Sequence, residues 1–130
     1  MTDTALPVLI RADDPDRQSE RDATHGEVDW RVLVDGKDGP TSGLVQSVAI
    51  FEAGGYENAH SHDRPQTGHV LSGRGKAVVA GKEHEIAAGD TLFIPAGTVH
   101  AWSAPDAAMQ VLVTFPADRL DDVATSFDGG

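Results

Sequence analysis

The sequence predicts an all-β fold, either a compact barrel or a sandwich of two sheets. Short segments rich in β-branched residues recur at regular spacing between residues 27 and 116, and turn-forming glycine and proline residues separate them. No segment before residue 116 has the apolar period of a helix. A chain of 130 residues is long enough to bury one core, so we expect one barrel domain with an extension at each end.

The first 26 residues are expected to form an N-terminal arm followed by a charged loop. The apolar run 6–10 is long enough for a short strand that packs on the domain or on a second subunit. Charged side chains dominate the segment 13–22, which predicts a solvent-exposed loop. The barrel is therefore expected to span residues 27–116.

The barrel strands follow from local patterns. Residues 26–34 alternate between apolar and polar side chains, with three valines and a tryptophan on one face, as in a half-buried strand. The segment 35–42 carries two glycine-containing turn signals. Further strands are expected at residues 44–51, 69–72, 76–80, 84–87, 91–94, 99–102 and 110–115.

Two further local signals concern a turn and the C-terminus. The two-residue link Gly81-Lys82 lies between apolar strands and predicts a tight hairpin. Pro116 suits the first turn of a helix, so residues 117–130 are expected to form a short C-terminal helix or tail.

Composition excludes several classes of function. The net charge of −11 at pH 7 disfavours nucleic acid and anionic membranes as partners, because their phosphates attract Lys and Arg. The absence of cysteine excludes disulfides, thiolate catalysis and cysteine-based zinc sites. The N-terminal apolar run is too short for a signal peptide or a membrane span, so we expect a cytoplasmic protein.

A histidine-rich stretch carries the first functional signal. His60 and His62 are separated by one residue, so both rings lie on one face of a strand, and Gln66 follows four positions later. Two imidazoles on one face form half of a metal site, although a solvated histidine-rich loop would give the same spacing. His100, which follows a turn at residues 95–97, supplies the other half.

Both segments resemble the two sequence motifs of the cupin superfamily. The first motif runs Gly, five residues, His-x-His, three or four residues, Glu, six residues, Gly, and the chain matches its spacing with Gly54, His60, His62, Gln66 and Gly73. The second motif runs Gly, five residues, Pro-x-Gly, two residues, His, three residues, Asn, and the chain matches it with Gly89, Pro95, Gly97 and His100, with Ala104 in the last place. The resemblance covers roughly residues 43–116 and is closest to small single-domain members.

The resemblance implies a cupin-type double-stranded β-helix, or jelly-roll barrel, with one divalent metal ion in its lumen. Carried over position by position, the metal ligands are His60, His62, Gln66 and His100. Three histidines with one neutral oxygen ligand suit manganese, iron, nickel, cobalt or zinc, and the ligand spacing does not distinguish among these metals. Gln66 replaces a glutamate, so the ligands leave the ion its full +2 charge, which favours Lewis-acid chemistry and weakens metal binding.

Strand alternation predicts part of the wall around these ligands. Tyr56 and Asn58 share a strand face with the histidine pair, and Trp102 shares one with His100, so all three are candidates for the wall of a substrate pocket. Ordinary packing in the barrel is the favoured alternative for Tyr56 and Trp102. No residue is assigned as the catalytic acid or base. The remaining histidines are interpreted as structural or surface residues: His25, His69 and His84.

Three functions fit such a site. The first is a metal-dependent lyase or isomerase that acts by Lewis-acid catalysis on a small oxygenated metabolite. The chain resembles two such cupin groups with a three-His, one-Gln site, the manganese hydroxynitrile lyases and the enzymes that linearise unsaturated uronates. It differs from the former at Trp102, where they have a histidine, and from the latter at Leu112, near which they have an aspartate. The second function is a dioxygenase of the quercetinase or dicarbonyl-cleaving type, and the third is a non-enzymatic small-molecule-binding cupin.

The expected partners are a small-molecule substrate and a second copy of the chain. No DNA-binding helix pair or basic patch accompanies the predicted barrel. Small cupins commonly pair, and the apolar arm 6–10 is suited to contact a neighbouring subunit, so we expect a homodimer.

Overall fold

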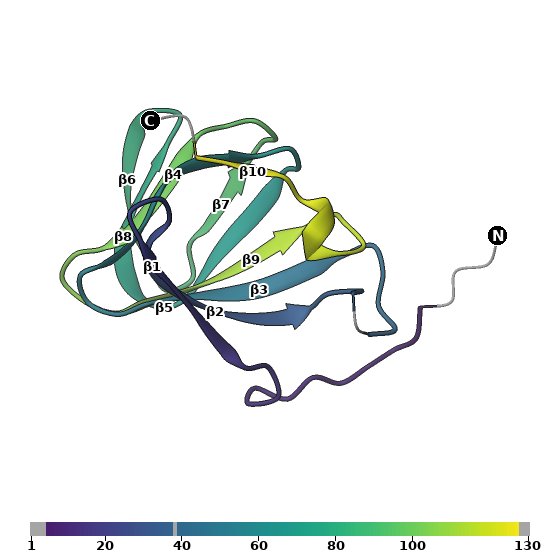
Figure 1. Cartoon of the computed structure of the whole chain (residues 1–130). Helices are drawn as coiled ribbons and strands as arrows, with labels where there is room; N and C mark the ends of the chain where they lie inside the picture. Colours follow the sequence, from purple (N-terminus) through teal and green to yellow (C-terminus); the bar gives the residue numbers. More distant parts are fainter. Residues whose placement is uncertain (1–4, 38, 128–130) are drawn as a thin grey trace.

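The computed structural model describes residues 5–37 and 39–127 and shows an all-β barrel (Figure 1). One turn of 3-10 helix, η1 (Leu120–Asp122), lies near the C-terminus. Within the described residues, no helix has the length and hydropathy needed to cross a bilayer. The strands, in chain order, are β1 (Arg17–Asp22), β2 (Gly26–Val34), β3 (Val45–Phe51), β4 (Gly55–His62), β5 (Gln66–Val79), β6 (Lys82–Ala87), β7 (Thr91–Ile94), β8 (His100–Ala104), β9 (Met109–Phe115) and β10 (Thr125–Ser126).

Antiparallel pairing closes the main strands into a ring. The strands follow the order β2-β3-β9-β5-β8-β4, and a further pairing of β4 with β2 closes the ring. The long strand β5 pairs with β7 and β9 through its first half and with β6 and β8 through its second half. Closure leaves this ring of strands without a free edge, and it encloses an interior that holds both the core and the candidate site.

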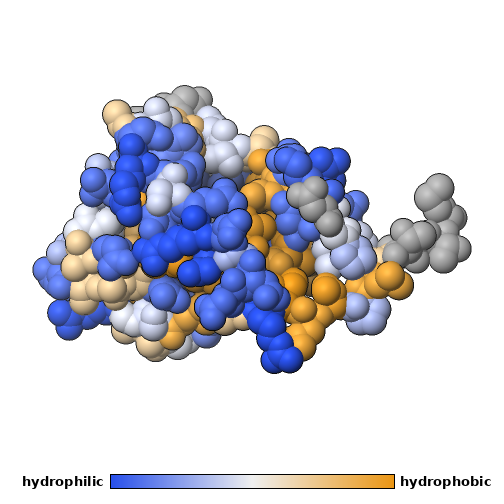
Figure 2. Space-filling model, turned by 60° about the horizontal axis from the view of Figure 1, so that its bottom comes forward, coloured by the Kyte–Doolittle hydropathy of each residue, from blue (hydrophilic) through white to orange (hydrophobic). Residues whose placement is uncertain are grey.

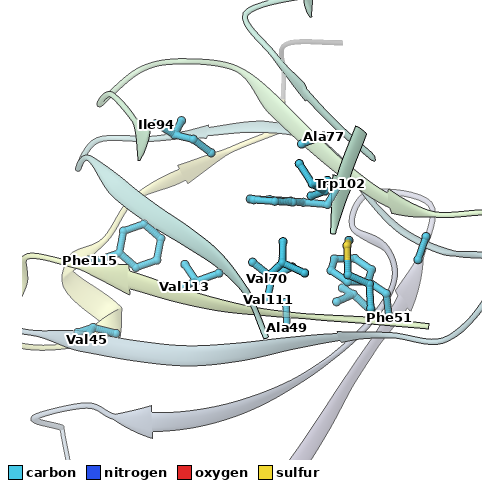
Figure 3. Close-up of a cluster of buried hydrophobic side chains, with 14 of the residues drawn as sticks. Val45, Ala49, Phe51, Val70, Ala77, Ile94, Trp102, Val111, Val113 and Phe115 are labelled. Carbon is cyan, nitrogen blue, oxygen red and sulfur yellow. The ribbon is translucent and has the colours of Figure 1, made fainter. Parts of the chain in front are cut away.

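Apolar side chains from β3, β5, β8 and β9 fill part of this interior (Figure 3). Trp102 lies at the boundary between the core and the cavity described below, because it belongs to the core cluster and also lines the cavity. A Cβ atom on Gly68 would lie 2.6 Å from Cη2 of Trp102, so the indole ring lies directly over the backbone of β5. The absence of a side chain at Gly68 therefore makes room for this ring.

The predicted strands at residues 26–34 and 91–94 are confirmed with the same bounds. The predicted strands 69–72 and 76–80 form one continuous strand, β5, because the residues between them form no turn. A register shift between Val70 and Ser72 marks a β-bulge, and Gly73 has a φ of 75°. A Cβ atom at Gly73 would lie 1.9 Å from the carbonyl oxygen of Ala108, so this glycine permits close strand contact.

The charged segment 13–22 is only partly a loop, and the prediction is wrong for residues 17–22. These residues form β1, which pairs with β2 along its whole length. Arg17 forms an ion pair with the buried carboxylate of Asp29, and Nη2 of Arg21 lies 2.9 Å from Oδ1 of the same residue. The charged arginines of β1, which in the sequence indicate an exposed loop, therefore form ion pairs with a residue of the neighbouring strand β2.

The predicted C-terminal helix is reduced to one 3-10 turn, η1, within residues 117–127, and residues 128–130 of that prediction lie outside the described residues. Oδ1 of Asp35 accepts a hydrogen bond from the backbone N–H of Leu120, and Oδ1 of Asp63 accepts one from that of Ala124. These backbone donors therefore have partners far along the chain instead of helical ones. The chain continues as β10, which lies beside β4 at one end of the barrel (Figure 1).

Candidate metal centre

Three histidines converge inside the barrel. His60 and His62 lie on β4, and His100 begins β8 directly opposite His60 in the strand register. One ring nitrogen of each histidine lies within 4.8 Å of those of the other two. Gln66, the first residue of β5, lines the same cavity as His60 and His62, and His60, His100 and Gln66 are at most 3% exposed. These four residues form a candidate metal site.

Hydrogen bonds at Nδ1 fix the direction of the rings. Nδ1 of His60 donates to the carbonyl oxygen of Asn58 at 2.6 Å, and Nδ1 of His100 donates to that of Thr98 at 3.0 Å. Nδ1 of His62 lies 2.9 Å from Oγ1 of Thr125. Because a carbonyl oxygen only accepts, Nδ1 of His60 and His100 carries the proton and Nε2 carries the lone pair that a metal requires.

Two buried acceptors at this site support a bound cation. Nε2 of His100 and Oε1 of Gln66 are buried and have no hydrogen-bond partner within the described residues. A buried polar atom without a partner is uncommon in folded proteins and costs stability. A divalent cation would interact with both lone pairs, so the donor set fits the metal that the sequence predicts.

Burial keeps the histidines in the neutral form that binds metals. It lowers the pKa of His60 to about 3 and that of His62 to about 4, and it also lowers the pKa of His100. The charge of His100 lowers the first two pKa values further, whereas the carbonyl of Asn58 raises that of His60. At neutral pH the three rings are therefore uncharged.

The metal-free protein is expected to lose stability in mild acid. As the pH falls below about 6.5, the unfolded chain binds protons before the folded protein does, because burial has lowered the histidine pKa values. His60 would reduce the free energy of unfolding by about 2 kcal/mol between pH 7 and pH 5, and the half-buried His62 would reduce it by less. Urea unfolding of chelator-treated protein at the two pH values measures this loss.

Glu57 is expected to offset part of that acid effect. Burial raises the pKa of Glu57 to about 8, so its contribution to stability is complete at low pH and is lost as the pH rises toward 8. The histidines should still determine the sign of the change in the free energy of unfolding between pH 7 and pH 5, because several of them act together. Equal unfolding midpoints at pH 7 and pH 5 would contradict the burial of the histidine cluster.

The site opens into a cavity of about 320 Å³. Trp30 lines this cavity, and its Nε1 is a buried donor without a partner among the described residues. No lysine or arginine is present in the described lining. Besides the ligands, the polar and aromatic residues of the lining are Gln18, Ser19, Glu20, His25, Trp30, Ser47, Glu57, Trp102, Phe115, Thr125 and Phe127.

Of the three predicted wall residues, Trp102 lines the cavity, whereas Tyr56 and Asn58 do not. A register shift on β4 explains the difference, because Glu57 pairs with Trp102 and His60 pairs with His100. This β-bulge adds one residue, so the alternation predicted from the sequence is shifted before the histidine pair. Tyr56 is 40% exposed on the outside. The side-chain amide of Asn58 instead donates to the carbonyls of residues 23 and 24.

Glu57 is a site residue that the sequence did not reveal. The bulge places its side chain in the cavity, where it is 6% exposed and its Oε1 lies 3.7 Å from Nε2 of His60. No hydrogen bond to its carboxyl group is found within the described residues. Burial, and to a lesser extent the charge of Glu20, raise the pKa of Glu57 to about 8. No local sequence signal distinguishes Glu57 from a surface glutamate.

His25 and Phe127 also contribute to the cavity. His25, which was interpreted as structural or surface, lines the cavity and lies edge-on to Phe127 at 4.8 Å between ring centroids. Phe127 lies 5.0 Å from the ring of His60. His69 agrees with the interpretation, because its Nδ1 bonds to Oγ1 of Thr91 away from the site. Neither His25 nor Phe127 has a motif spacing that could have identified it.

The family of the chain follows from its match to a domain model. The model of the cupin domain matches residues 47–115, which is more than half of the chain and includes all four candidate ligands. This chain is a cupin. The jelly-roll fold that the motifs implied is thereby confirmed together with the closed antiparallel barrel. The four ligand positions of this cupin lie close to one another, as a metal site requires.

A comparison with known proteins relates this cupin to lyases. It is 29% identical over 121 residues to the dimethylsulfoniopropionate lyase DddW of Ruegeria pomeroyi, covering 93% of this chain and 80% of that protein. Its structure is similar to that of the dimethylsulfoniopropionate lyase DddQ of the same species, with 25% identity and a TM-score of 0.69 over 86% of this chain and 58% of that chain. The polyketide cyclase RemF of Streptomyces resistomycificus shares the fold, with 23% identity and a TM-score of 0.78 over 93% of this chain and 84% of that chain.

Proposed function

We propose that this cupin is a metal-dependent lyase that acts on a small carboxylate with a cationic leaving group. The observation that carries this proposal is the converging set of three imidazoles and one amide, in which two buried acceptor atoms lack a partner within the described residues. The similarity to DddW over most of the chain supports the lyase class. The name dimethylsulfoniopropionate specifies a sulfonium cation and a carboxylate, which is the substrate class that we propose.

His60, His62, Gln66 and His100 would hold the ion through imidazole nitrogens and the amide oxygen. A bound divalent ion supplies Lewis-acid polarisation of a substrate oxygen. Because all four ligands are neutral, the site would favour an anionic oxygen ligand, such as the carboxylate of the substrate. Manganese, iron, nickel, cobalt and zinc all suit three imidazoles and one neutral oxygen.

The rest of the cavity suits a cationic group. Its described lining contains the carboxyl groups of Glu20 and Glu57 and no basic side chain besides histidine. Trp30, Trp102 and Phe127 contribute aromatic rings, whose faces attract cations. We therefore propose that the carboxylate of the substrate lies at the histidine cluster and its cationic end lies against these rings.

We propose Glu57 as the proton acceptor. The elimination removes a proton from the carbon next to the carboxylate, the C–H electron pair forms a C=C bond, and the C–S electron pair leaves with the sulfide. Oε1 of Glu57 lies beside His60, within the cavity that would hold this carbon. Since burial raises the pKa of Glu57 to about 8, its ionised form is a stronger base than a solvated carboxylate, although it is the minor form at pH 7 in the metal-free protein.

Gas chromatography of dimethyl sulfide tests the proposed reaction. Chelator-treated protein is loaded in turn with each of the five metals and supplied with dimethylsulfoniopropionate, and at least one metal is expected to give turnover well above the protein-free rate. Mandelonitrile cleavage and oxygen uptake with flavonols or β-diketones are measured in parallel. Activity only in those assays would replace the proposal with a hydroxynitrile lyase or a dioxygenase. Tight metal binding without turnover in any assay would favour a binding protein.

Gln66→Glu is expected to tighten metal binding at least tenfold. A carboxylate at this position adds a negative charge next to the ion and restores the ligand type of the cupin motif. Isothermal titration with Mn²⁺ and Zn²⁺ measures the change. Gln18→Glu, which adds the same charge elsewhere in the cavity lining, is the matched control. Equal affinities of the two variants would show that residue 66 is not a ligand.

We propose that the N-terminal arm joins two copies of the chain. Leu6 and Leu9 are 63% and 69% exposed, and Figure 2 shows hydrophobic residues along the arm and on the adjoining surface. A second copy would remove this apolar surface from water. The double variant Leu6→Glu/Leu9→Glu is expected to change a dimer into a monomer in size-exclusion chromatography with light scattering. A monomeric wild-type protein would contradict the proposal.

A further inference from the structure

The C-terminal segment 123–127 forms one wall of the cavity next to the histidine pair. Its strand β10 pairs with the end of β4, where Thr125 lies opposite His62. Oδ1 of Asp63 accepts a hydrogen bond of 2.9 Å from the N–H of Ala124, and the carbonyl of Ala124 accepts one of 3.2 Å from the N–H of Asp63. These paired bonds join the segment to the strand that carries two of the candidate ligands.

His62 depends on this segment for its orientation, unlike the other two histidines. Nδ1 of His60 and of His100 bonds to a carbonyl two residues earlier in the chain. Nδ1 of His62 has its partner 63 positions away, at Oγ1 of Thr125. Hydrogen bonds of this kind set the ring direction of a metal-binding histidine and raise its basicity. The C-terminal segment, and not the chain next to the histidine, therefore sets the orientation of the His62 ring.

Phe127 lies next to His60 of the histidine pair. Its ring lies 5.0 Å from that of His60 with 32° between the planes, and it meets the ring of His25 edge-on at 4.8 Å. An aromatic ring in this position keeps water away from the imidazoles, because it fills space that would otherwise be hydrated. The segment thus contributes both a polar contact and an apolar cover to the same cluster.

We infer that residues 123–127 act as a strap that positions His62 and shields the bound ion. The inference rests on the metal site proposed above. The strap lies beyond residues 47–115, the part of the chain that matches the cupin domain model. Thr125 is a positioning residue that acts through His62, and Phe127 slows exchange of the ion with solvent.

Thr125→Val tests the positioning role. Valine keeps the shape of threonine but lacks the hydroxyl, so the affinity for Zn²⁺ or Mn²⁺ is expected to fall about tenfold, as is typical when the partner of a metal-binding histidine is removed. Thr125→Ser keeps the hydroxyl and is expected to bind within twofold of the wild type. If Thr125 acted only through its shape, Thr125→Ser would bind the metal more weakly than Thr125→Val, because serine loses the methyl group that valine retains.

Phe127→Ala tests the shielding role. Metal release from the loaded protein to an excess of chelator is expected to be at least tenfold faster in Phe127→Ala, whereas Phe127→Leu keeps an apolar cover and should release the ion at close to the wild-type rate. Circular dichroism confirms that each variant is folded.

The outcomes separate the two proposals. A wild-type protein that binds no divalent ion would overturn the proposed function and this inference together. If the wild type binds the ion, the inference alone would be overturned by two results together: Thr125→Val binds the ion as tightly as Thr125→Ser, and Phe127→Ala releases it at the wild-type rate.

Discussion

Replacing His100 with alanine is expected to weaken divalent metal binding at least about a hundredfold. The ring proton of His100 lies on Nδ1, and its Nε2 is buried without a hydrogen-bond partner within the described residues. The variant therefore removes the atom that would bind the ion. His100 also lies opposite His60 in the strand register, so the variant removes the ligand that β8 contributes to the cluster. Isothermal titration of chelator-treated protein with Mn²⁺ and Zn²⁺ measures the loss.

His69→Ala is the matched control for His100→Ala. His69 lies on β5, and its ring bonds to Thr91 outside the cavity, so its removal should change metal affinity by less than twofold. Metal should also raise the unfolding temperature of the wild type and of His69→Ala, but not that of His100→Ala, because a ligand stabilises only a state that binds it. Equal affinities of the two variants would show that His100 is not a ligand.

Replacing Glu57 with glutamine is expected to lower the turnover number at least about a hundredfold. Glutamine has nearly the same shape as glutamate but cannot accept a proton at neutral pH. The metal affinity of the variant should stay within a few-fold of the wild type, because Glu57 is not one of the four proposed ligands. Steady-state release of dimethyl sulfide and isothermal titration on the same preparation measure the two quantities.

Glu27→Gln provides the control for Glu57→Gln. Glu27 is exposed on β2, where it pairs with Tyr56, the residue before Glu57 on β4. The control removes the same charge close to the site but outside the cavity, and it should leave turnover unchanged. Full activity of Glu57→Gln would place the base elsewhere. Loss of metal together with activity would instead make Glu57 part of metal binding.

The sequence predicted those parts of the fold that depend on neighbouring residues. The alternation over residues 26–34 and the turns on either side of residues 91–94 are local, and both strands have the predicted bounds. The four candidate ligands were predicted because two spaced motifs resemble those of cupins, and the structure brings these residues together. The metal that they would bind remains a prediction.

The failures have a common physical cause, which is a long-range contact that overrides a local pattern. Tyr56 and Asn58 lie outside the cavity because a bulge in β4 shifts the alternation by one residue, and the turn between β1 and β2 holds Asn58 in that position. The same bulge brings Glu57 inside. Residues 17–22 form a strand because their arginines pair with the distant Asp29.

The C-terminal segment illustrates the same limit. Pro116 suggests a helix, yet the carboxylates of Asp35 and Asp63 accept hydrogen bonds from backbone donors there, and Asp63 holds the chain next to the end of β4. These contacts, together with the pairing of β10 and β4, bring Phe127 to the site. No spacing in the sequence connects Phe127 with a histidine pair more than sixty positions earlier.

Elemental analysis of the natively purified protein tests the central claim most directly. The metal-site account predicts one divalent transition-metal ion per chain in the wild type and almost none in His60→Ala and His100→Ala, with all three proteins folded. A wild-type protein that contains no such ion and takes up none on titration, or variants that retain the full metal content, would contradict it.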